Sequence, residues 1–209
     1  MRKTLFLVWV LCLTACTVSV KKMTLLPDIQ DSYVLPDRPF FHVEEGDILR
    51  LSLSSMNQDA LSAYLTAGRE FAVDDLGEIL LPVLGRLSVG GKTEAEVEQM
   101  LLQAIRPQVS DVLVRVHIIN ATVTLLGEVR EEHHVSISRP IPLLEAISSS
   151  GGFTRNARRD NILVQRRENG KIRHYRVNLL TDTLFTSPCF YLQKGDIVYV
   201  SPLYPLNVR

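Results

Sequence analysis

The stretch from Gly85 to Thr93 (GRLSVGGKT) contains the residue types that bind phosphate groups. A phosphate-binding loop needs the spacing Gly-x₄-Gly-Lys-Ser/Thr, because successive backbone N–H groups must surround the phosphates. Counting back from the Gly-Lys-Thr triplet places Arg86 where the first glycine belongs, and Gly85 lies one residue too far. The spacing therefore favours a glycine turn before a capped helix over a nucleotide site.

Two adjacent histidines, His133 and His134, follow Glu131 and Glu132 and offer metal-ligating groups. Neighbouring residues on a strand point to opposite faces, and no cysteine partner or HExxH helix accompanies them. We therefore predict a polar loop between two strands and no metal or other cofactor. The sequence also lacks a nucleophile elbow and a recognisable Cys/His spacing, so no catalytic residue is assigned and an enzyme is not expected.

The thiol of Cys16 occupies a position that is typical of a modification site. A basic start precedes nine apolar residues (5–13), which form an export signal and are too few to span a bilayer. Leu13-Thr14-Ala15-Cys16 is similar to a bacterial lipobox, which implies cleavage between Ala15 and Cys16 and lipid attachment to the thiol. Several acyl chains, at about 0.8 kcal/mol per buried methylene group, would hold the chain on a membrane. An ordinary signal peptide with a chance cysteine is the alternative.

The residue after the modified cysteine is Thr17, where an aspartate would favour retention in the inner membrane. This indicates the outer membrane, with the body of the protein in the periplasm. Cleavage would leave Cys189 as the only free thiol. In an oxidising compartment, a single unpaired cysteine is most simply a buried small apolar residue.

Charge is balanced overall and separated locally. The chain of 209 residues has 23 basic and 23 acidic side chains, which argues against a general nucleic-acid binder. Residues 44–78 hold eight acidic residues against two basic ones, and residues 155–176 hold eight basic residues against two acidic ones. Three interpretations remain open: solvated loops, head-to-tail contact between subunits that closes a ring, and contact with an anionic polysaccharide. The candidate contact residues are Arg155, Arg158, Arg159, Arg166 and Arg167.

Hydrophobic periodicity predicts an N-terminal β-β-α-β unit after a proline-containing tether. Strands are expected at 48–53 and 112–119, with a short apolar run at 79–84 that Pro82 interrupts. Thr93 and Glu96 form a capping box at the start of a helix that Pro107 ends.

A second unit is predicted after residue 120. Its expected elements are strands at 123–129, 135–137, 162–164, 172–177 and 196–200 and a helix that starts after Pro142 and ends at Gly151-Gly152. Asn169-Gly170 between two strands predicts a hairpin. Both units contain Gly-Asp-Ile followed by an alternating strand, at Gly46 and at Gly195. Gly-Asp opens strands well, so this similarity alone does not establish a duplication.

These segments together resemble the outer-membrane polysaccharide export family, whose type member is Wza. The N-terminal resemblance lies in residues 41–51, 73–85 and 89–93, and the second unit is similar to the family's SLBB domain at 123–129, 143–154 and 192–200. The resemblance implies an α+β fold of two small domains, the first a β-β-α-β-type export domain and the second β-grasp-like. The expected divisions are a signal peptide (1–15), a lipidated N-terminus and tether (16–39), the export domain (40–119), the SLBB domain (120–201) and a tail (202–209).

The resemblance further implies a ring-shaped homo-oligomer through which capsule or exopolysaccharide leaves the periplasm, with an inner-membrane co-polymerase as partner. Longer relatives carry further SLBB repeats and a C-terminal amphipathic helix, whereas here the chain has one such repeat and a tail with two prolines. We therefore expect a short form that a lipid anchors. The alternatives are a non-conducting scaffold or regulator of the co-polymerase that affects chain length, and a polysaccharide-modifying enzyme.

Overall fold

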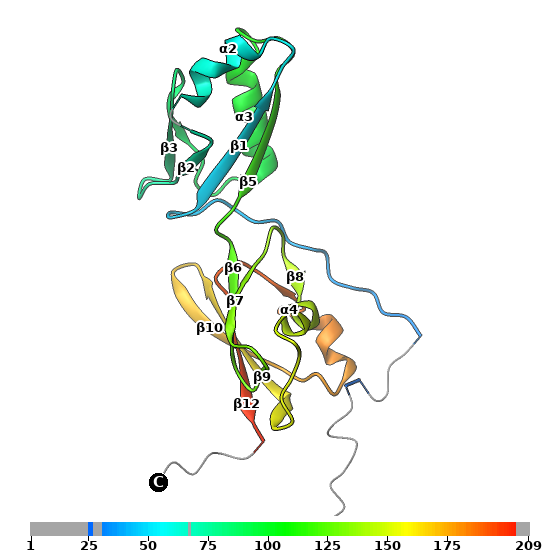
Figure 1. The fold of residues 1–209 in the computed structure, drawn as a ribbon. Coiled ribbons are helices and arrows are strands. Elements are labelled where there is room, and N and C mark those ends of the chain that lie inside the picture. Colours follow the sequence, from blue (N-terminus) through cyan, green and yellow to red (C-terminus); the bar gives the residue numbers. More distant parts are fainter. Residues whose placement is uncertain (1–24, 27–30, 67, 204–209) are drawn as a thin grey trace, which may run out of the picture.

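The chain folds into two domains joined end to end, as seen in a computed structural model that describes residues 25–26, 31–66 and 68–203 (Figure 1). Residues 31–39 form no helix or strand and run beside the second domain before the chain enters the first. Tyr33 in this segment stacks on Phe185 of the second domain at 4.2 Å between ring centroids. The described part of the expected tether therefore packs on the protein.

The first domain is a three-stranded antiparallel sheet with one long helix and a separate hairpin. Its sheet has the strand order β2-β1-β5, and β3 pairs with β4. The elements are β1 (Ile48–Ser54), α2 (Gln58–Ser62), η3 (Ala63–Leu65), β2 (Glu70–Ala72), β3 (Glu78–Leu81), β4 (Gly85–Ser88), α3 (Glu94–Ile105) and β5 (Leu113–Ile118). The expected β-β-α-β order is thus extended by β2, β4 and the short α2–η3 segment, which the periodicity did not indicate.

Helix α3 begins as the sequence predicts. The Thr93 hydroxyl accepts a hydrogen bond from the Glu96 N–H at 3.3 Å, and the Glu96 carboxylate accepts one from the Thr93 N–H at 2.7 Å. Val97, Leu101 and Ile105 on one face of the helix are buried against the sheet. Two glutamates of α3 accept the outward N–H groups of β5: Glu94 accepts that of Ile118 at 2.7 Å, and Glu98 that of Val116 at 3.0 Å. The helix thereby covers the β5 edge of this sheet.

The second domain is built on a five-stranded sheet with the order β10-β9-β12-β6-β7, in which only the β12–β6 pair is parallel. Helix α4 lies on one side of this sheet, and Leu143, Ala146 and Ile147 bury its apolar face (Figure 1). The elements are β6 (Thr122–Gly127), β7 (His133–Ser136), β8 (Ile141–Pro142), α4 (Leu143–Ser149), β9 (Ala157–Glu168), β10 (Lys171–Val177), η4 (Asp182–Thr186), β11 (Tyr191–Leu192) and β12 (Ile197–Pro202). The molecule is therefore mixed α+β in two domains, as expected.

Local turn chemistry sets the register of the second domain. Asn169 and Gly170 have φ values of 50° and 72° in the β9–β10 turn, which confirms the predicted hairpin. The expectation that the two adjacent histidines lie in a loop is wrong, because His133 begins strand β7. Here β7 pairs with β6, and His134 Nδ1 lies 2.9 Å from the Thr124 hydroxyl. Backbone pairing to β6 outweighed the polar character of the segment.

Three carboxylates of the first domain accept hydrogen bonds that favour their charged forms. The Glu78 N–H holds the pKa of Asp74 below its ordinary value of 3.8, the Ser55 hydroxyl does the same for Asp111, and the Thr93 N–H lowers the pKa of Glu96 from 4.5. A lowered folded-state pKa stabilises the fold above the unfolded pKa and ceases to do so as pH falls through the folded one.

We therefore expect the first domain to lose stability as pH falls below about 4.5. Urea unfolding of the full chain at pH 7, 4 and 3, followed by hydrogen exchange at the amides of α3 and β5, would measure the unfolding midpoint of the first domain at each pH. Asp74→Asn should reduce the pH dependence, since it removes one titrating group. An unfolding midpoint that stays constant from pH 7 to pH 3 would contradict the interpretation.

Candidate functional site: charged surfaces and the domain junction

The five candidate arginines do not form one patch. Arg155 and Arg158 are exposed at the start of β9, and Arg158 pairs with Asp160 at 3.2 Å. Arg159 is half-buried with its guanidinium 5.3 Å from the centre of the Phe153 ring. Arg167 lies near the other end of this 12-residue strand, roughly 25 Å from Arg159 at a rise of about 3.3 Å per residue. The exposed arginines of this stretch therefore lie at opposite ends of β9. Arg155 and Arg158 lie at the end away from the first domain, and Arg167 lies at the end near it.

Arg166 is not a surface contact residue, which corrects the expectation from the sequence. Its Nε and Nη2 donate to the two Asp196 carboxylate oxygens at 2.9 and 2.6 Å. It also donates to the carbonyls of Pro188 and Tyr191, and the side chain is only 6% exposed. Burial by itself disfavours the charged guanidinium, but the hydrogen bonds and charge of Asp196 raise the pKa of Arg166 overall. The side chain has an internal structural role.

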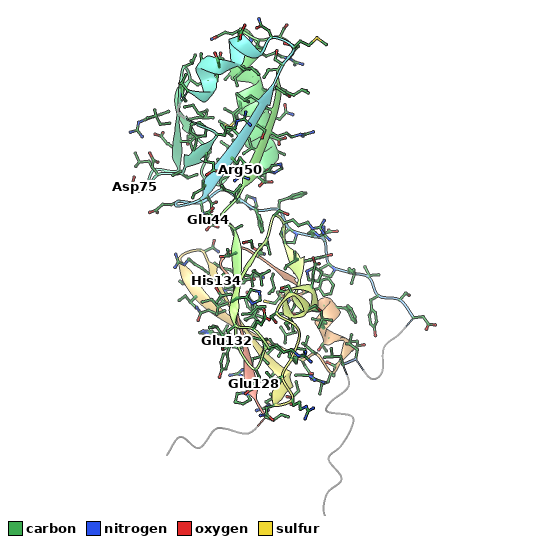
Figure 2. The ribbon with its side chains drawn as sticks, in the orientation of Figure 1. Glu44, Arg50, Asp75, Glu128, Glu132 and His134 are labelled. Carbon is green, nitrogen blue, oxygen red and sulfur yellow. The ribbon has the colours of Figure 1, made fainter. Side chains whose placement is uncertain are left out.

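The acidic stretch of the first domain is partly neutralised by the domain's own arginines. Arg50 pairs with Glu70 at 2.7 Å, and Arg86 pairs with Asp74 at 2.9 Å. Arg86 also lies 3.4 Å from Glu78. Among the described residues of 44–78, the exposed acidic residues without an ion pair are Glu45, Asp59 and Asp75. Asp75 lies on the periphery of the domain in Figure 2. The net acidic surface is therefore smaller than the residue count suggests.

The two Gly-Asp-Ile segments form matching turns. In the first, Gly46 has φ +81°, the Asp47 N–H donates to the Glu44 carbonyl at 3.1 Å, and the Asp47 carboxylate accepts the Glu44 N–H at 2.8 Å. In the second, Gly195 has φ +80°, and Asp196 makes the same two bonds with Gln193 at 3.1 and 2.8 Å. Glycine is required at this position because φ lies in the left-handed region.

These two turns meet at the junction between the domains. Lys194 of the second turn donates to the carboxylate of Asp47 in the first and lies 3.9 Å from Glu44, which is labelled at the junction in Figure 2. Asn120, between the domains, accepts the Ile48 N–H and donates to the Gly46 carbonyl, both at 2.9 Å. The Lys194 and Asp47 side chains are each only 11% exposed, so a shielded ion pair joins the domains.

We expect Lys194→Met to loosen this junction, since it keeps the aliphatic stem but leaves the Asp47 carboxylate without its cation. The cost should be about 2 kcal/mol, the range for stranding a partly buried polar group. Limited proteolysis should then cut the segment around Asn120 several-fold faster than in wild type. The matched control, Lys171→Met at the exposed start of β10, should leave the cleavage rate unchanged. Equal rates in both variants would contradict a role for Lys194 at the junction.

Two hollows flank the segment that crosses the junction. One, of about 330 Å³, is lined by residues from this segment, the end of β9 and the second turn: Phe40, Phe41, His42, Glu44, Arg166, Arg167, Gln193, Lys194 and Gly195. The other, of about 290 Å³, is lined by Arg38, Pro39, Phe40, Phe41, Glu94, Ser138, Arg139 and Pro140. The junction therefore combines rigid hydrogen bonding with surface concavity.

Sequence reasoning missed Lys194, Asp47 and Asn120 as a group. The repeated Gly-Asp-Ile was the available signal, because it marked both turns. It did not show that the turns face one another, since that depends on how the two domains meet.

Two of the segments that carry the SLBB resemblance, 123–129 and 143–154, contact one another in the second domain. Val129 forms a bridge with Phe153, and Thr154 donates to the Glu128 carboxylate.

The glycine-rich stretch before α3 does not present free amides to a phosphate. The N–H groups of Val89 and Gly90 both donate to the Gly77 carbonyl, and that of Gly91 donates to the Val43 carbonyl. No group of three or more metal-ligating side chains is clustered within the ranges that the structure describes. The glycines therefore shape the turn that precedes the capped helix, as the spacing predicts.

The expected lipid site, Cys16, and the cleavage position after Ala15 lie outside the described residues. No helix of the described part of the chain has both the length and the apolar character needed to cross a bilayer. Cys189 is fully buried, as predicted, and burial raises the pKa of its thiol to about 12.

Comparison with known families gives a match for each domain. Residues 36–119 match the family described as polysaccharide biosynthesis/export protein, and residues 121–200 match the SLBB domain. The two matches are consecutive and leave only Asn120 between them.

Proposed function

The chain belongs to the polysaccharide export family with a single SLBB domain, and on that basis we propose that it is an outer-membrane lipoprotein of a capsule or exopolysaccharide export apparatus. It forms or braces a periplasmic ring around the polymer path and works with an inner-membrane co-polymerase. The observation that supports this most strongly is the uninterrupted succession of the two family domains. The interlocked turns at the junction support a fixed geometry between these domains.

The anchor is proposed to be a lipid on Cys16, at the cleavage position after Ala15. The support is the sequence Leu13-Thr14-Ala15-Cys16 after a short apolar run. A residue with several acyl chains would keep the chain on the outer membrane without a spanning helix.

Complementation of a deletion strain tests this function. We expect loss of surface polysaccharide in the deletion strain, rescue by wild type, and no rescue by Cys16→Ala at equal protein amount. Labelling with a radioactive fatty acid, present in wild type and absent in Cys16→Ala, is the control for the modification. Full rescue by an unlipidated Cys16→Ala chain would contradict the anchor, and normal surface polymer in the deletion strain would contradict the export role.

Ring assembly is proposed to use opposite charges on neighbouring subunits. Arg155 and Arg158 offer exposed positive charge on the second domain, and Asp75 offers exposed negative charge on the first. Contacts between different surfaces of successive copies close into a ring when the rotation permits.

Arg155→Glu/Arg158→Glu should shift the detergent-solubilised protein from oligomer to monomer at a given concentration, with a dissociation constant raised about tenfold or more. Both side chains are exposed, so folding should be retained. Arg106→Glu/Arg115→Glu, on exposed positions of the first domain, is the control with the same charge change. Mass photometry distinguishes the outcomes, and an unchanged mass distribution in both variants would discard this interface.

A further inference from the structure

Phe40 occupies an unusual position at the domain junction. It lines both hollows, and 76% of its surface is exposed, whereas its neighbour Phe41 is buried at 7%. Phe41 thus fixes the segment in the core and leaves the Phe40 ring as a wall between two concave surfaces. An exposed aromatic face between hollows is suited to the apolar C–H face of a pyranose ring.

Each hollow also carries an arginine without a carboxylate partner. Arg139 in one hollow and Arg167 in the other are exposed and make no ion pair within the described residues. Of the other cations there, Arg166 is paired with Asp196 and Lys194 with Asp47, and the Arg38 guanidinium lies 5.2 Å from the centre of the Tyr191 ring. A guanidinium with free donors is well matched to a carboxylate, which it can hold with two parallel hydrogen bonds.

Two carboxylates, Glu44 and Glu94, line the hollows. Glu44 lies 3.9 Å from Lys194, and Glu94 accepts the Ile118 N–H and lies 3.9 Å from His117. Glu94 is therefore engaged by an N–H donor, whereas the Glu44 side chain remains largely exposed. Arg38, Arg139 and Arg167 are the arginines of the two hollows that have no carboxylate partner within the described residues. Each hollow is near the lower end of the range of about 300–1,000 Å³ for small-molecule sites, which suits a short saccharide segment.

We propose that the domain junction binds a short acidic segment of a polysaccharide, with a sugar ring against Phe40 and sugar carboxylates at Arg139 and Arg167. The proposal rests on the export function proposed above and places polymer contact at the junction, away from the arginines at the start of β9. The Lys194–Asp47 ion pair and the hydrogen bonds of Asn120 fix the geometry of the site before binding, so that little ordering is needed when the saccharide binds.

The test is an NMR titration of the full chain in detergent micelles with tri-galacturonate, and with maltotriose as the neutral probe. We expect saturable shifts at residues 38–42, 139 and 167, with a dissociation constant of about 1 mM for tri-galacturonate and binding at least about tenfold weaker for maltotriose. Arg139→Ala/Arg167→Ala and Phe40→Ala should each weaken tri-galacturonate binding about tenfold or more. Arg69→Ala/Arg106→Ala removes the same charge at exposed positions of the first domain and should leave the affinity unchanged.

Three results would overturn the site: no saturable shift with tri-galacturonate, equal affinity for maltotriose, or junction variants that bind like wild type. Unchanged unfolding midpoints in the variants confirm that any loss is local, because all three side chains are exposed. Binding in the titration together with normal surface polymer in the deletion strain would overturn the export function and leave the site. Loss of surface polymer in the deletion strain without any binding would do the reverse.

Discussion

Gly127→Ala should abolish the native packing of the second domain. Gly127 ends β6 with φ +86°, and a Cβ atom added there would lie 2.2 Å from the Val200 carbonyl oxygen of β12. That oxygen accepts the Glu128 N–H at 2.9 Å, so it cannot move without breaking the parallel β6–β12 pairing at the centre of the sheet. A backbone overlap combined with an unfavourable φ should cost roughly 4 kcal/mol or more.

The matched control for this variant is Gly170→Ala in the β9–β10 turn. Gly170 also has a positive φ, +72°, but a Cβ atom there meets nothing within 4 Å. The control therefore measures the backbone cost alone, about 1 kcal/mol.

Alkylation of Cys189 at pH 8 offers a direct readout of opening of the second domain. The thiol is fully buried and its raised pKa of about 12 keeps it protonated in the folded state. Gly127→Ala should raise the labelling rate by orders of magnitude, and Gly170→Ala only a few-fold, when the Cys189 peptide is followed by mass spectrometry. Similar rates in the two variants would show that the close approach to Val200 is not what requires glycine.

Asp196→Ala should be nearly as damaging, because it leaves the buried Arg166 guanidinium without its anion. Removing one partner of a buried ion pair costs about 3–5 kcal/mol. Asp196 also accepts the Gln193 N–H, so the same change removes the hydrogen bond that closes the second Gly-Asp-Ile turn. Urea unfolding of the full chain, followed by hydrogen exchange of β9 and β12, would measure the loss.

Two comparisons separate the buried charge from general disruption. Glu70→Ala breaks the Arg50 pair, whose side chains are about half exposed, and should change stability by about 1 kcal/mol or less. Arg166→Met/Asp196→Ala removes both charges and should be more stable than Asp196→Ala alone. If the double variant is less stable than Asp196→Ala, the unpaired charge is not the source of the damage.

Much of the fold could be predicted where local chemistry decides it. The Thr93–Glu96 capping box, the Asn169-Gly170 turn and the glycines of the two Gly-Asp-Ile turns each satisfy nearby backbone groups, so their sequence signals are reliable. Strand β2 was missed because it has three residues and one buried side chain, which is too short for a period to show. Strand β7 was expected at 135–137 but begins at His133, because its pairing with β6 determines the conformation of the two polar histidines.

The candidate site was harder to predict because its interactions are non-local. Arg166 and Asp196 are 30 residues apart, and Lys194 and Asp47 are 147 residues apart. No periodicity connects such pairs, and a count of arginines cannot distinguish a buried Arg166 from an exposed Arg167. The charge count indicated a basic stretch correctly but did not reveal its division between the two ends of β9.

The proposed role in polysaccharide export is tested most directly by the compartment in which the polymer is found in a deletion strain. Polymer should be measured on the cell surface and in the periplasm, and its chain length determined by gel electrophoresis. We predict loss of surface polymer with accumulation in the periplasm, reversed by the wild-type gene. Normal amounts of surface polymer with altered chain length would contradict export and favour a scaffold or regulator of the co-polymerase.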